Sequence, residues 1–214
     1  MIKLFGRQTS FNVQKVCWLL GELELPFEHE ELGGRFGGLT SSDFGALNPH
    51  RKVPVLKDDE LVIWESHSIL RYLAAAYGGE SWWPASPKER SHIDRWLDWH
   101  ATRLQPDFMT LFWGFYRQPQ ATRNWRAISA ARSALEASYL ILDAELVSKP
   151  FVAGATLSLA DIATGATLFR YFGMGLDVAR PPHVAAWYER LKERPAYQQH
   201  IMTSFQELRA RSTF

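Results

Sequence analysis

The chain has 214 residues, of which 46% are hydrophobic and 22% are charged, and its formal net charge at pH 7 is +1. This composition is typical of a soluble globular protein and excludes disorder over most of the length. The balanced charge provides no general attraction to nucleic acid or to an anionic membrane, and no apolar run is long enough to span a bilayer. A single cysteine excludes an internal disulfide and a multi-cysteine zinc site. With no signal-peptide pattern at its start, we expect a cytoplasmic protein without a metal.

The first part of the chain has the pattern of a strand, a helix and a second strand. A short apolar run at residues 2–5 predicts a buried strand, and apolar residues at helical spacing predict a helix over 13–23. Pro26 ends this helix, and residues 27–32 can form the next strand. The length of the connection favours parallel strands, so the unit is βαβ.

A glycine-rich loop at residues 33–38 separates this unit from a predicted hairpin. The loop lacks the Gly-Lys-Ser/Thr ending of a phosphate-binding loop. Strands at 53–56 and 61–64 flank a four-residue turn, and a helix follows around 69–73. The order is therefore β-α-β, loop, β-β-α.

Residues 78–87 are rich in glycine, proline and serine and predict a linker between two domains, at 1–80 and 88–214. The second domain has only helical patterns. The predicted helices cover 93–115 with a kink at Pro106, 125–146, 159–172, 184–191 and 197–208.

A capping box opens one of these helices. Ser158 can cap the helix, and the Asp161 carboxylate can reach back to the Ser158 amide, with Leu157 and Ile162 at the positions of a hydrophobic staple. A catalytic role for Asp161 is the alternative. We favour the structural role because every neighbour fits it.

The order of elements and three motifs resemble those of cytosolic glutathione transferases. Val53-Pro54 opens the third strand, where the family keeps a cis-proline; Glu65-Ser66 joins the fourth strand to a helix; and Ser158-Leu-Ala-Asp161 matches the family's capping box. Residues 6–13 are most similar to the bacterial GstB-like subgroup. The resemblance covers almost the whole chain. It implies an α/β thioredoxin-like N-terminal domain, an all-α C-terminal domain and a homodimer.

The resemblance also implies where glutathione binds. The free amides at the start of the helix after Ser66 suit the γ-glutamyl carboxylate, and Glu65 supplies an opposite charge for the γ-glutamyl amine. If the bond before Pro54 is cis, Val53 can present its backbone to the cysteinyl part of the peptide. A plain helix cap at Ser66 and a solvated Glu65 are the alternatives.

The glycine carboxylate of glutathione needs a cation. Lys52, with Arg51 beside it, and Arg35 in the glycine-rich loop are the candidates. A solvated basic turn is an equally good interpretation of Lys52 and Arg51.

The group that holds the glutathione thiolate should lie at the start of the first helix. An unperturbed thiol has a pKa of about 8.5, and a hydroxyl or amide donor near a helix N-terminus can lower it. Ser10 is the preferred donor, Asn12 a second contact and Thr9 a third candidate. Each of them could instead only cap the helix. The tyrosine version is excluded, because no tyrosine precedes Tyr72.

Two residues with reactive side chains are assigned to the core. Cys17 lies more than a turn inside the first helix on its apolar face, which argues against thiol–disulfide exchange. His100 is interpreted as a buried histidine whose hydrogen bonds are satisfied.

The second substrate should meet aromatic residues of the long helix. Trp113 and Tyr116 lie off its regular apolar stripe, and Arg117 follows them directly. An arginine beside an aromatic wall suits a small hydrophobic or anionic electrophile, such as one with a carboxylate or a halogen. A solvated helix end is the alternative for Arg117.

We therefore predict a glutathione transferase that conjugates the glutathione thiolate to such electrophiles. A glutathione-dependent peroxidase or reductase is a second possibility, and a non-catalytic glutathione-binding module is a third.

Overall fold

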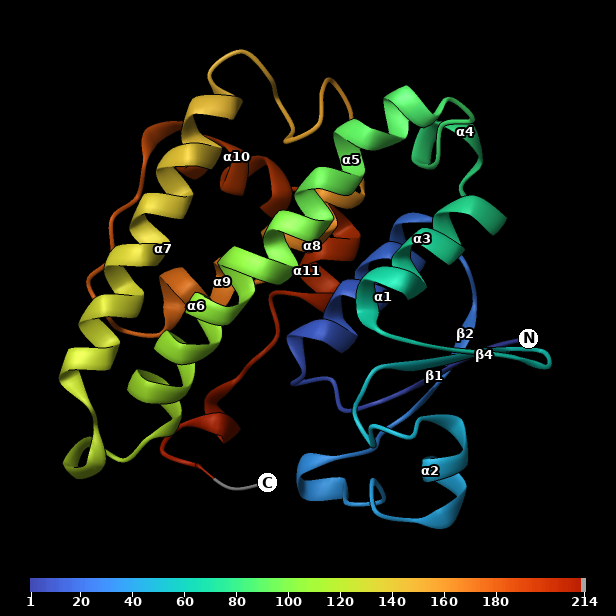
Figure 1. Ribbon diagram of the computed structural model, residues 1–214, viewed down its shortest axis with the longest axis horizontal. Coiled ribbons are helices and arrows are strands. Elements are labelled where there is room, and N and C mark those ends of the chain that lie inside the picture. The colour runs from blue at the N-terminus through green and yellow to red at the C-terminus, as the bar shows by residue number, and fades with distance from the viewer. Residues whose placement is uncertain (213–214) are drawn as a thin grey trace.

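The computed structural model describes residues 1–212 and contains two domains that lie side by side (Figure 1). The N-terminal domain has a four-stranded sheet in the order β2-β1-β3-β4. Strand β1 (Ile2–Phe5) pairs in parallel with β2 (Phe27–Glu30) and antiparallel with β3 (Val55–Asp58), and β3 pairs antiparallel with β4 (Leu61–Trp64). The predicted βαβ-ββα order is confirmed.

Two long helices of this domain, α1 (Phe11–Glu22) and α3 (Ser66–Tyr77), pack against each other. A short helix, α2 (Ser42–Leu47), lies between the glycine-rich loop and β3, where the sequence pattern predicts no helix. Its start is capped by the Ser41 hydroxyl, which accepts a hydrogen bond from the Phe44 amide at 3.2 Å. The predicted linker also contains a single helical turn, α4 (Gly79–Trp82).

The long helix predicted over 93–115 is present but its hydrogen-bond register changes twice. Helix α5 (Pro87–Trp99) passes through a π-helical turn at His100–Leu104 into α6 (Gln105–Leu111), and a second π-helical turn follows at Phe112–Arg117. Proline at the second residue of α6 has no N–H to donate to the preceding turn, which explains a disturbance at that place. These π-helical turns carry His100, Trp113 and Arg117.

The remaining helices agree with the sequence in place but differ in continuity. The single helix predicted over 159–172 is wrong, because the chain breaks at Ala166–Thr167 into two helices. The helix predicted over 197–208 is also wrong, because residues 201–205 leave the helix. The helices are α7 (Trp125–Leu146), α8 (Leu159–Gly165), α9 (Leu168–Gly173), α10 (Pro182–Lys192) and α11 (Pro195–His200).

The structural interpretation of Asp161 is confirmed. Its Oδ2 accepts hydrogen bonds from the Ser158 amide at 3.0 Å and from the Ser158 hydroxyl at 2.9 Å. Its Oδ1 accepts from the Val152 amide at 2.8 Å and from Trp187 Nε1 at 3.0 Å. The fully buried carboxylate thus joins the start of α8 to α10 and to the loop before α8.

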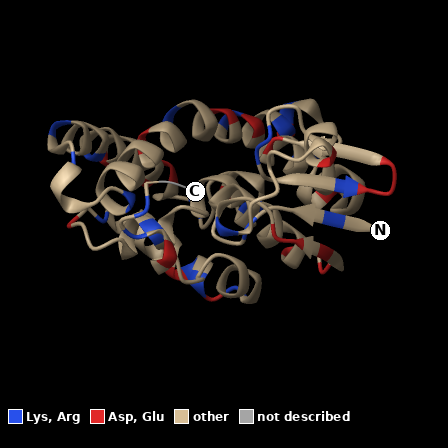
Figure 2. Cartoon of the chain, turned by 90° about the horizontal axis from the view of Figure 1, so that it is seen from below, with Lys and Arg blue, Asp and Glu red and all other residues tan. Residues whose placement is uncertain are grey.

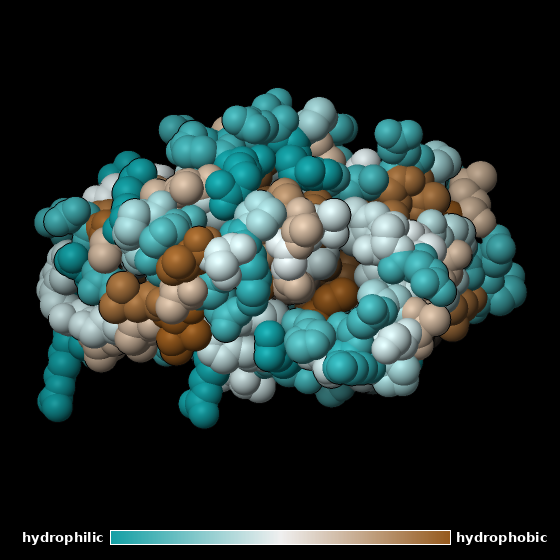
Figure 3. Space-filling view, turned by 90° about the horizontal axis from the view of Figure 1, so that it is seen from above, coloured by the Kyte–Doolittle hydropathy of each residue, from teal (hydrophilic) through white to brown (hydrophobic). Residues whose placement is uncertain are grey.

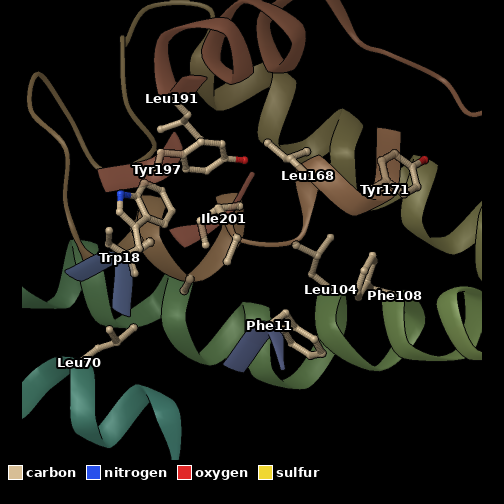
Figure 4. Close-up of a cluster of buried hydrophobic side chains, with 14 of the residues drawn as sticks. Phe11, Trp18, Leu70, Leu104, Phe108, Leu168, Tyr171, Leu191, Tyr197 and Ile201 are labelled. Atoms are coloured by element: carbon tan, nitrogen blue, oxygen red, sulfur yellow. The ribbon is translucent and has the colours of Figure 1, made fainter. Parts of the chain in front are cut away.

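The hydrophobic core is continuous from one domain to the other. Trp18 of α1 is fully buried and meets the ring of Tyr197 of α11 edge to face, with centroids 4.8 Å apart. Figure 4 shows Trp18 beside Leu191, Tyr197 and Ile201, all from the helical domain. Helix α1 therefore packs against both domains, and its N-terminus lies at the interface between them.

The surface is mixed. Figure 2 shows Lys and Arg interleaved with Asp and Glu over both domains, and Figure 3 shows apolar residues in separate patches on one face. Within residues 1–212, no helix combines the length and the hydropathy needed to cross a membrane.

Candidate active site

A cavity of about 550 Å³ lies between the two domains at the N-terminus of α1. One wall comes from the N-terminal domain and the other from α6 and the π-helical turn after it. Seven of the candidate residues line it, namely Thr9, Ser10, Asn12, Lys52, Val53, Trp113 and Arg117.

The segment predicted to hold the thiolate faces this cavity. Ser10 occupies the N-cap position of α1, but its side chain makes no capping hydrogen bond. Asn12 is partly exposed to the cavity. The Thr9 hydroxyl is buried without a hydrogen-bond partner among the described residues, while its carbonyl accepts a bond from Arg170 Nη2 at 3.0 Å. The Ser10 hydroxyl is therefore not engaged in capping α1.

Behind Asn12 lies Lys15, which the sequence analysis does not single out. It is fully buried, and its Nζ donates to Asn12 Oδ1 at 3.0 Å and to Gln105 Oε1 at 3.0 Å. The same nitrogen lies 3.3 Å from His67 Nε2. Burial lowers the pKa of the ammonium well below its ordinary value, and the charge of Glu65 opposes that shift. Its position three residues after Asn12, inside an otherwise apolar helix face, is the signal in the sequence.

The predicted cis bond is present between Val53 and Pro54. Val53 lines the cavity, and the Lys52 side chain is exposed at its edge. Arg51 is committed to its own domain, because its Nη1 donates to the carbonyls of Leu39 at 3.1 Å and Ser41 at 2.7 Å. Of the two neighbouring cations, Lys52 has the less constrained side chain.

The start of α3 differs by one residue from the expectation. The helix begins at Ser66, so Glu65 rather than Ser66 takes the N-cap position, with a positive φ of 71°. The Ser66 hydroxyl is buried and donates to Asn12 Oδ1 at 3.5 Å. This contact links the start of α3 to the start of α1, so the two predicted glutathione-binding segments are adjacent.

Three arginines converge on the cavity from different elements. Arg7 precedes α1, Arg117 ends the π-helical turn and Arg170 comes from α9. Burial lowers the pKa of Arg170 to about 9 and that of Arg117 to about 10, and in both cases the charge of Arg7 adds to the shift. These pKa values leave Arg117 and Arg170 positively charged at neutral pH.

Two of these guanidinium groups are incompletely paired. Arg170 is 2% exposed, and its Nη2 donates to Gln14 Oε1 at 2.8 Å, but its Nε is buried without a hydrogen-bond partner among residues 1–212. The Nε of Arg7 is in the same situation. Arg117 stacks on Trp113, with its Cζ 3.8 Å from the ring centroid. Sequence reasoning missed Arg7 and Arg170, which only the fold brings together.

Five candidate residues are not among those that line this cavity: Pro54, Glu65 and Ser66, which belong to the adjacent glutathione-binding segments, and two that line other cavities. Tyr116 is buried and lines a separate cavity of about 500 Å³ with Phe115 and Phe169. Arg35 is 62% exposed, pairs with Glu207 at 3.1 Å and lines a third cavity of about 300 Å³.

Comparison with known proteins identifies the family. Models of the glutathione S-transferase N-terminal and C-terminal domains match residues 4–81 and 124–190. The glutathione S-transferase GstB of Escherichia coli (strain K12) is 39% identical over 204 residues, which are 94% of this chain and 98% of that protein. The chain belongs to the glutathione S-transferase family.

Solved glutathione S-transferases share the fold of this one. The theta class enzyme from Xanthomonas axonopodis pv. citri, solved with glutathione bound, has a TM-score of 0.91 and 39% identity, covering 95% of this chain and 98% of that chain. Human glutathione S-transferase T1-1 has a TM-score of 0.84 and 26% identity, covering 94% and 90%.

The two side chains assigned to the core of this glutathione S-transferase have different outcomes. Cys17 is 4% exposed, as predicted, and burial raises the pKa of its thiol to about 12. His100 is fully buried, but the expectation of satisfied hydrogen bonds is wrong, because neither ring nitrogen has a partner among the described residues. Burial, with the charge of Lys15, lowers the pKa of His100 well below its usual value, so the ring is neutral at pH 7.

Proposed function

We propose that this glutathione S-transferase conjugates glutathione to small electrophiles that carry a carboxylate, halogenated acids among them. The observation that carries the proposal is the group of three arginines on one cavity, of which Arg7 and Arg170 each keep an unpartnered buried Nε. A buried guanidinium that lacks a partner is stabilised by an arriving anion.

Glutathione would occupy the wall formed by the N-terminal domain. The free amides at the start of α3, from Ser66 onward, would take the γ-glutamyl carboxylate, and Glu65 the amine. The backbone of Val53 before cis-Pro54 would pair with the cysteinyl part of the peptide. Lys52 suits the glycine carboxylate better than Arg35, which pairs with Glu207.

The sulfur would then lie at the start of α1. The Ser10 hydroxyl and the Asn12 amide would donate hydrogen bonds to the thiolate, with Thr9 as a weaker candidate, and the amides of the first turn of α1 would add to its stabilisation. With a haloacid, the thiolate forms the C–S bond as the C–halogen bond breaks, and the halide leaves with the bonding electrons.

The carboxylate of the second substrate would be held by Arg7, Arg117 and Arg170, beside the face of Trp113. These groups would set the distance between the reacting carbon and the thiolate, so their contribution is positioning and charge compensation. Tyr116, in its separate cavity, would not contact this substrate.

A matched pair of electrophiles tests the proposal. We expect kcat/KM for iodoacetate to exceed that for iodoacetamide by at least about tenfold, after subtraction of the uncatalysed rate. Arg7→Met and Arg117→Met should each lower kcat/KM for iodoacetate by roughly 10- to 100-fold and change that for iodoacetamide much less. Arg123→Met, in the other cavity, is the control. Equal rates with both electrophiles in the unmodified enzyme would contradict the assignment.

The alternatives differ in their support. A reductase with its own thiol is disfavoured by the burial of Cys17. Peroxidase activity would need only the same glutathione thiolate, and no specific feature of the cavity favours it. A homodimer in the cytoplasm completes the proposal, supported by the family alone, and sedimentation analysis of the purified enzyme tests the dimer.

A further inference from the structure

Lys15 is a buried cation without a counter-ion in contact. It is fully buried one turn inside α1, and no carboxylate among residues 1–212 forms an ion pair with it. An uncompensated buried charge is costly unless its donors are all satisfied. Apolar packing therefore does not explain why a lysine occupies this position between α1, α3 and α6.

The three ammonium donors of Lys15 meet three neutral acceptors. Two are the side-chain oxygens of Asn12 and Gln105, each at 3.0 Å. The third is His67 Nε2 at 3.3 Å. The His67 ring also forms a hydrogen bond with the backbone of Leu97, and this bond raises the pKa of the ring. A bond that favours the protonated ring is one in which a ring N–H donates, and Nδ1 is the nitrogen that does so, because Nε2 faces Lys15. Nε2 is then free to accept from Lys15.

This arrangement fixes the orientation of the Asn12 carboxamide. Lys15 Nζ donates to Asn12 Oδ1, so the atom of the Asn12 carboxamide that faces the lysine is the oxygen. The Ser66 hydroxyl lies 3.5 Å from that same oxygen. With its oxygen held on the inner side by two groups, Asn12 has its NH₂ on the opposite side, and Asn12 lines the cavity.

We propose that Lys15 is a positioning residue for thiolate formation, which holds the Asn12 carboxamide with its NH₂ directed at the glutathione sulfur. The inference rests on the proposed contact between Asn12 and the thiolate. Without Lys15 the carboxamide can turn over and present its oxygen, which repels a thiolate instead of donating to it. Other charged or titratable groups around Lys15 are His67 on α3, His100 on the π-helical turn and the more distant Glu65.

The pKa of enzyme-bound glutathione tests this directly, because the thiolate absorbs far-ultraviolet light much more strongly than the thiol and no electrophile is needed. Lys15→Met keeps the length and apolar stem of the side chain and removes its donors. We expect the pKa of the bound thiol to rise by about one unit, which is a tenfold change in the ionisation equilibrium. Turnover should fall about 5- to 10-fold near pH 6.5 and recover near pH 9, while the Kd for glutathione stays within about threefold.

Two comparisons separate positioning from a general structural effect. His100→Leu alters an equally buried side chain at the same interface that makes no hydrogen bond to Asn12, and it should leave the thiol pKa unchanged. In an Asn12→Ala background, Lys15→Met should cause no further rise. An unchanged thiol pKa in folded Lys15→Met, an equal rise in His100→Leu, or additive effects in the double variant would each overturn the inference.

Two further measurements cover the case in which Lys15→Met does not fold. Lys15→Gln retains a shorter, neutral donor, and it should raise the thiol pKa by a smaller amount than one unit. In the unmodified enzyme, the Asn12 side-chain NH₂ should give a single rigid pair of NMR resonances that shifts when glutathione binds; an averaged or unresponsive pair would overturn the inference. If the proposed substrate class is wrong, the rates with iodoacetate and iodoacetamide will be equal. The pKa of enzyme-bound glutathione will still lie below that of free glutathione, so the two failures are distinguishable.

Discussion

Cys17 is the residue that would have to act as nucleophile if this transferase carried out thiol–disulfide exchange with a thiol of its own. Its side chain is 4% exposed on the inner face of α1, and burial raises the pKa of the thiol to about 12. A neutral buried thiol is a poor nucleophile, since the thiolate is the reactive form. The sulfur used in catalysis must therefore come from glutathione.

We expect Cys17→Ala to keep transferase activity within about threefold and to lose about 1–2 kcal/mol of folding free energy. Native Cys17 should react with an aromatic disulfide reagent far more slowly than the unfolded chain does. A rapid stoichiometric reaction of the native enzyme, with parallel loss of activity, would contradict this.

The raised pKa of the Cys17 thiol also makes the free energy of unfolding depend on pH at high pH. The unfolded chain loses the proton near the ordinary pKa of 9.0, whereas the folded protein keeps it to about 12. The stabilising contribution is therefore complete below pH 9.0 and is lost as the pH rises toward 12. In urea unfolding experiments, the free energy of unfolding of Cys17→Ala should decline less steeply over this pH range than that of the unmodified protein.

The candidate site is predictable from sequence where a local motif defines it. Ser10, Asn12 and Val53 belong to short segments with fixed roles in the fold, and all three line the cavity. Lys15 and Arg170 could not be found in this way. Each sits on a helix whose pattern indicates only packing, and their significance depends on groups far away in the chain, such as Gln105 for Lys15.

Among the helices, α8 has its N-terminus held by the carboxylate of one residue, Asp161. Asp161 accepts hydrogen bonds from Val152, Ser158 and Trp187, so its removal leaves several buried donors unpaired. We expect Asp161→Ala to lower the free energy of unfolding by about 3 kcal/mol or more, measured by urea denaturation. Asp177→Ala, at an exposed position, is the control. A loss below about 1 kcal/mol would show that the network contributes little.

A helix is predictable from the sequence where its apolar period is long, and less so where tertiary contacts interrupt that period. The boundaries of α7 agree with the sequence because its apolar face is continuous over residues 125–146. The chain leaves the helix after α11, where the Thr203 hydroxyl accepts a hydrogen bond from Gln14 Nε2 at 2.8 Å. Helix α2 has only one or two turns, too few to reveal a period in the sequence.

At the scale of the whole molecule, α1 ties the two domains into one unit. The nearly buried Glu22 carboxylate accepts hydrogen bonds from Trp18 Nε1 and from Arg194 Nε, both at 2.8 Å, so α1 is bonded to the helical domain at its far end. Two domains with a shared core and such a link should unfold together.

We expect a single cooperative transition in urea, with the same midpoint by tryptophan fluorescence and by far-ultraviolet circular dichroism. Arg194→Met should lower that midpoint, because it leaves the Glu22 carboxylate without its ion pair, at a cost of roughly 2–4 kcal/mol. Arg95→Met, at an exposed position on α5, should leave it unchanged. Two separated transitions in the unmodified protein would contradict the shared-core interpretation.

In the enzyme without substrate, Arg7, Arg117 and Arg170 give the cavity a positive potential. A cavity with this density of positive charge will hold whatever small anion the solution offers. Chloride, sulfate and phosphate from buffers would then compete with the proposed carboxylate-bearing substrate. The choice of counter-ion, and not only the ionic strength, will therefore set the KM that an assay returns for it.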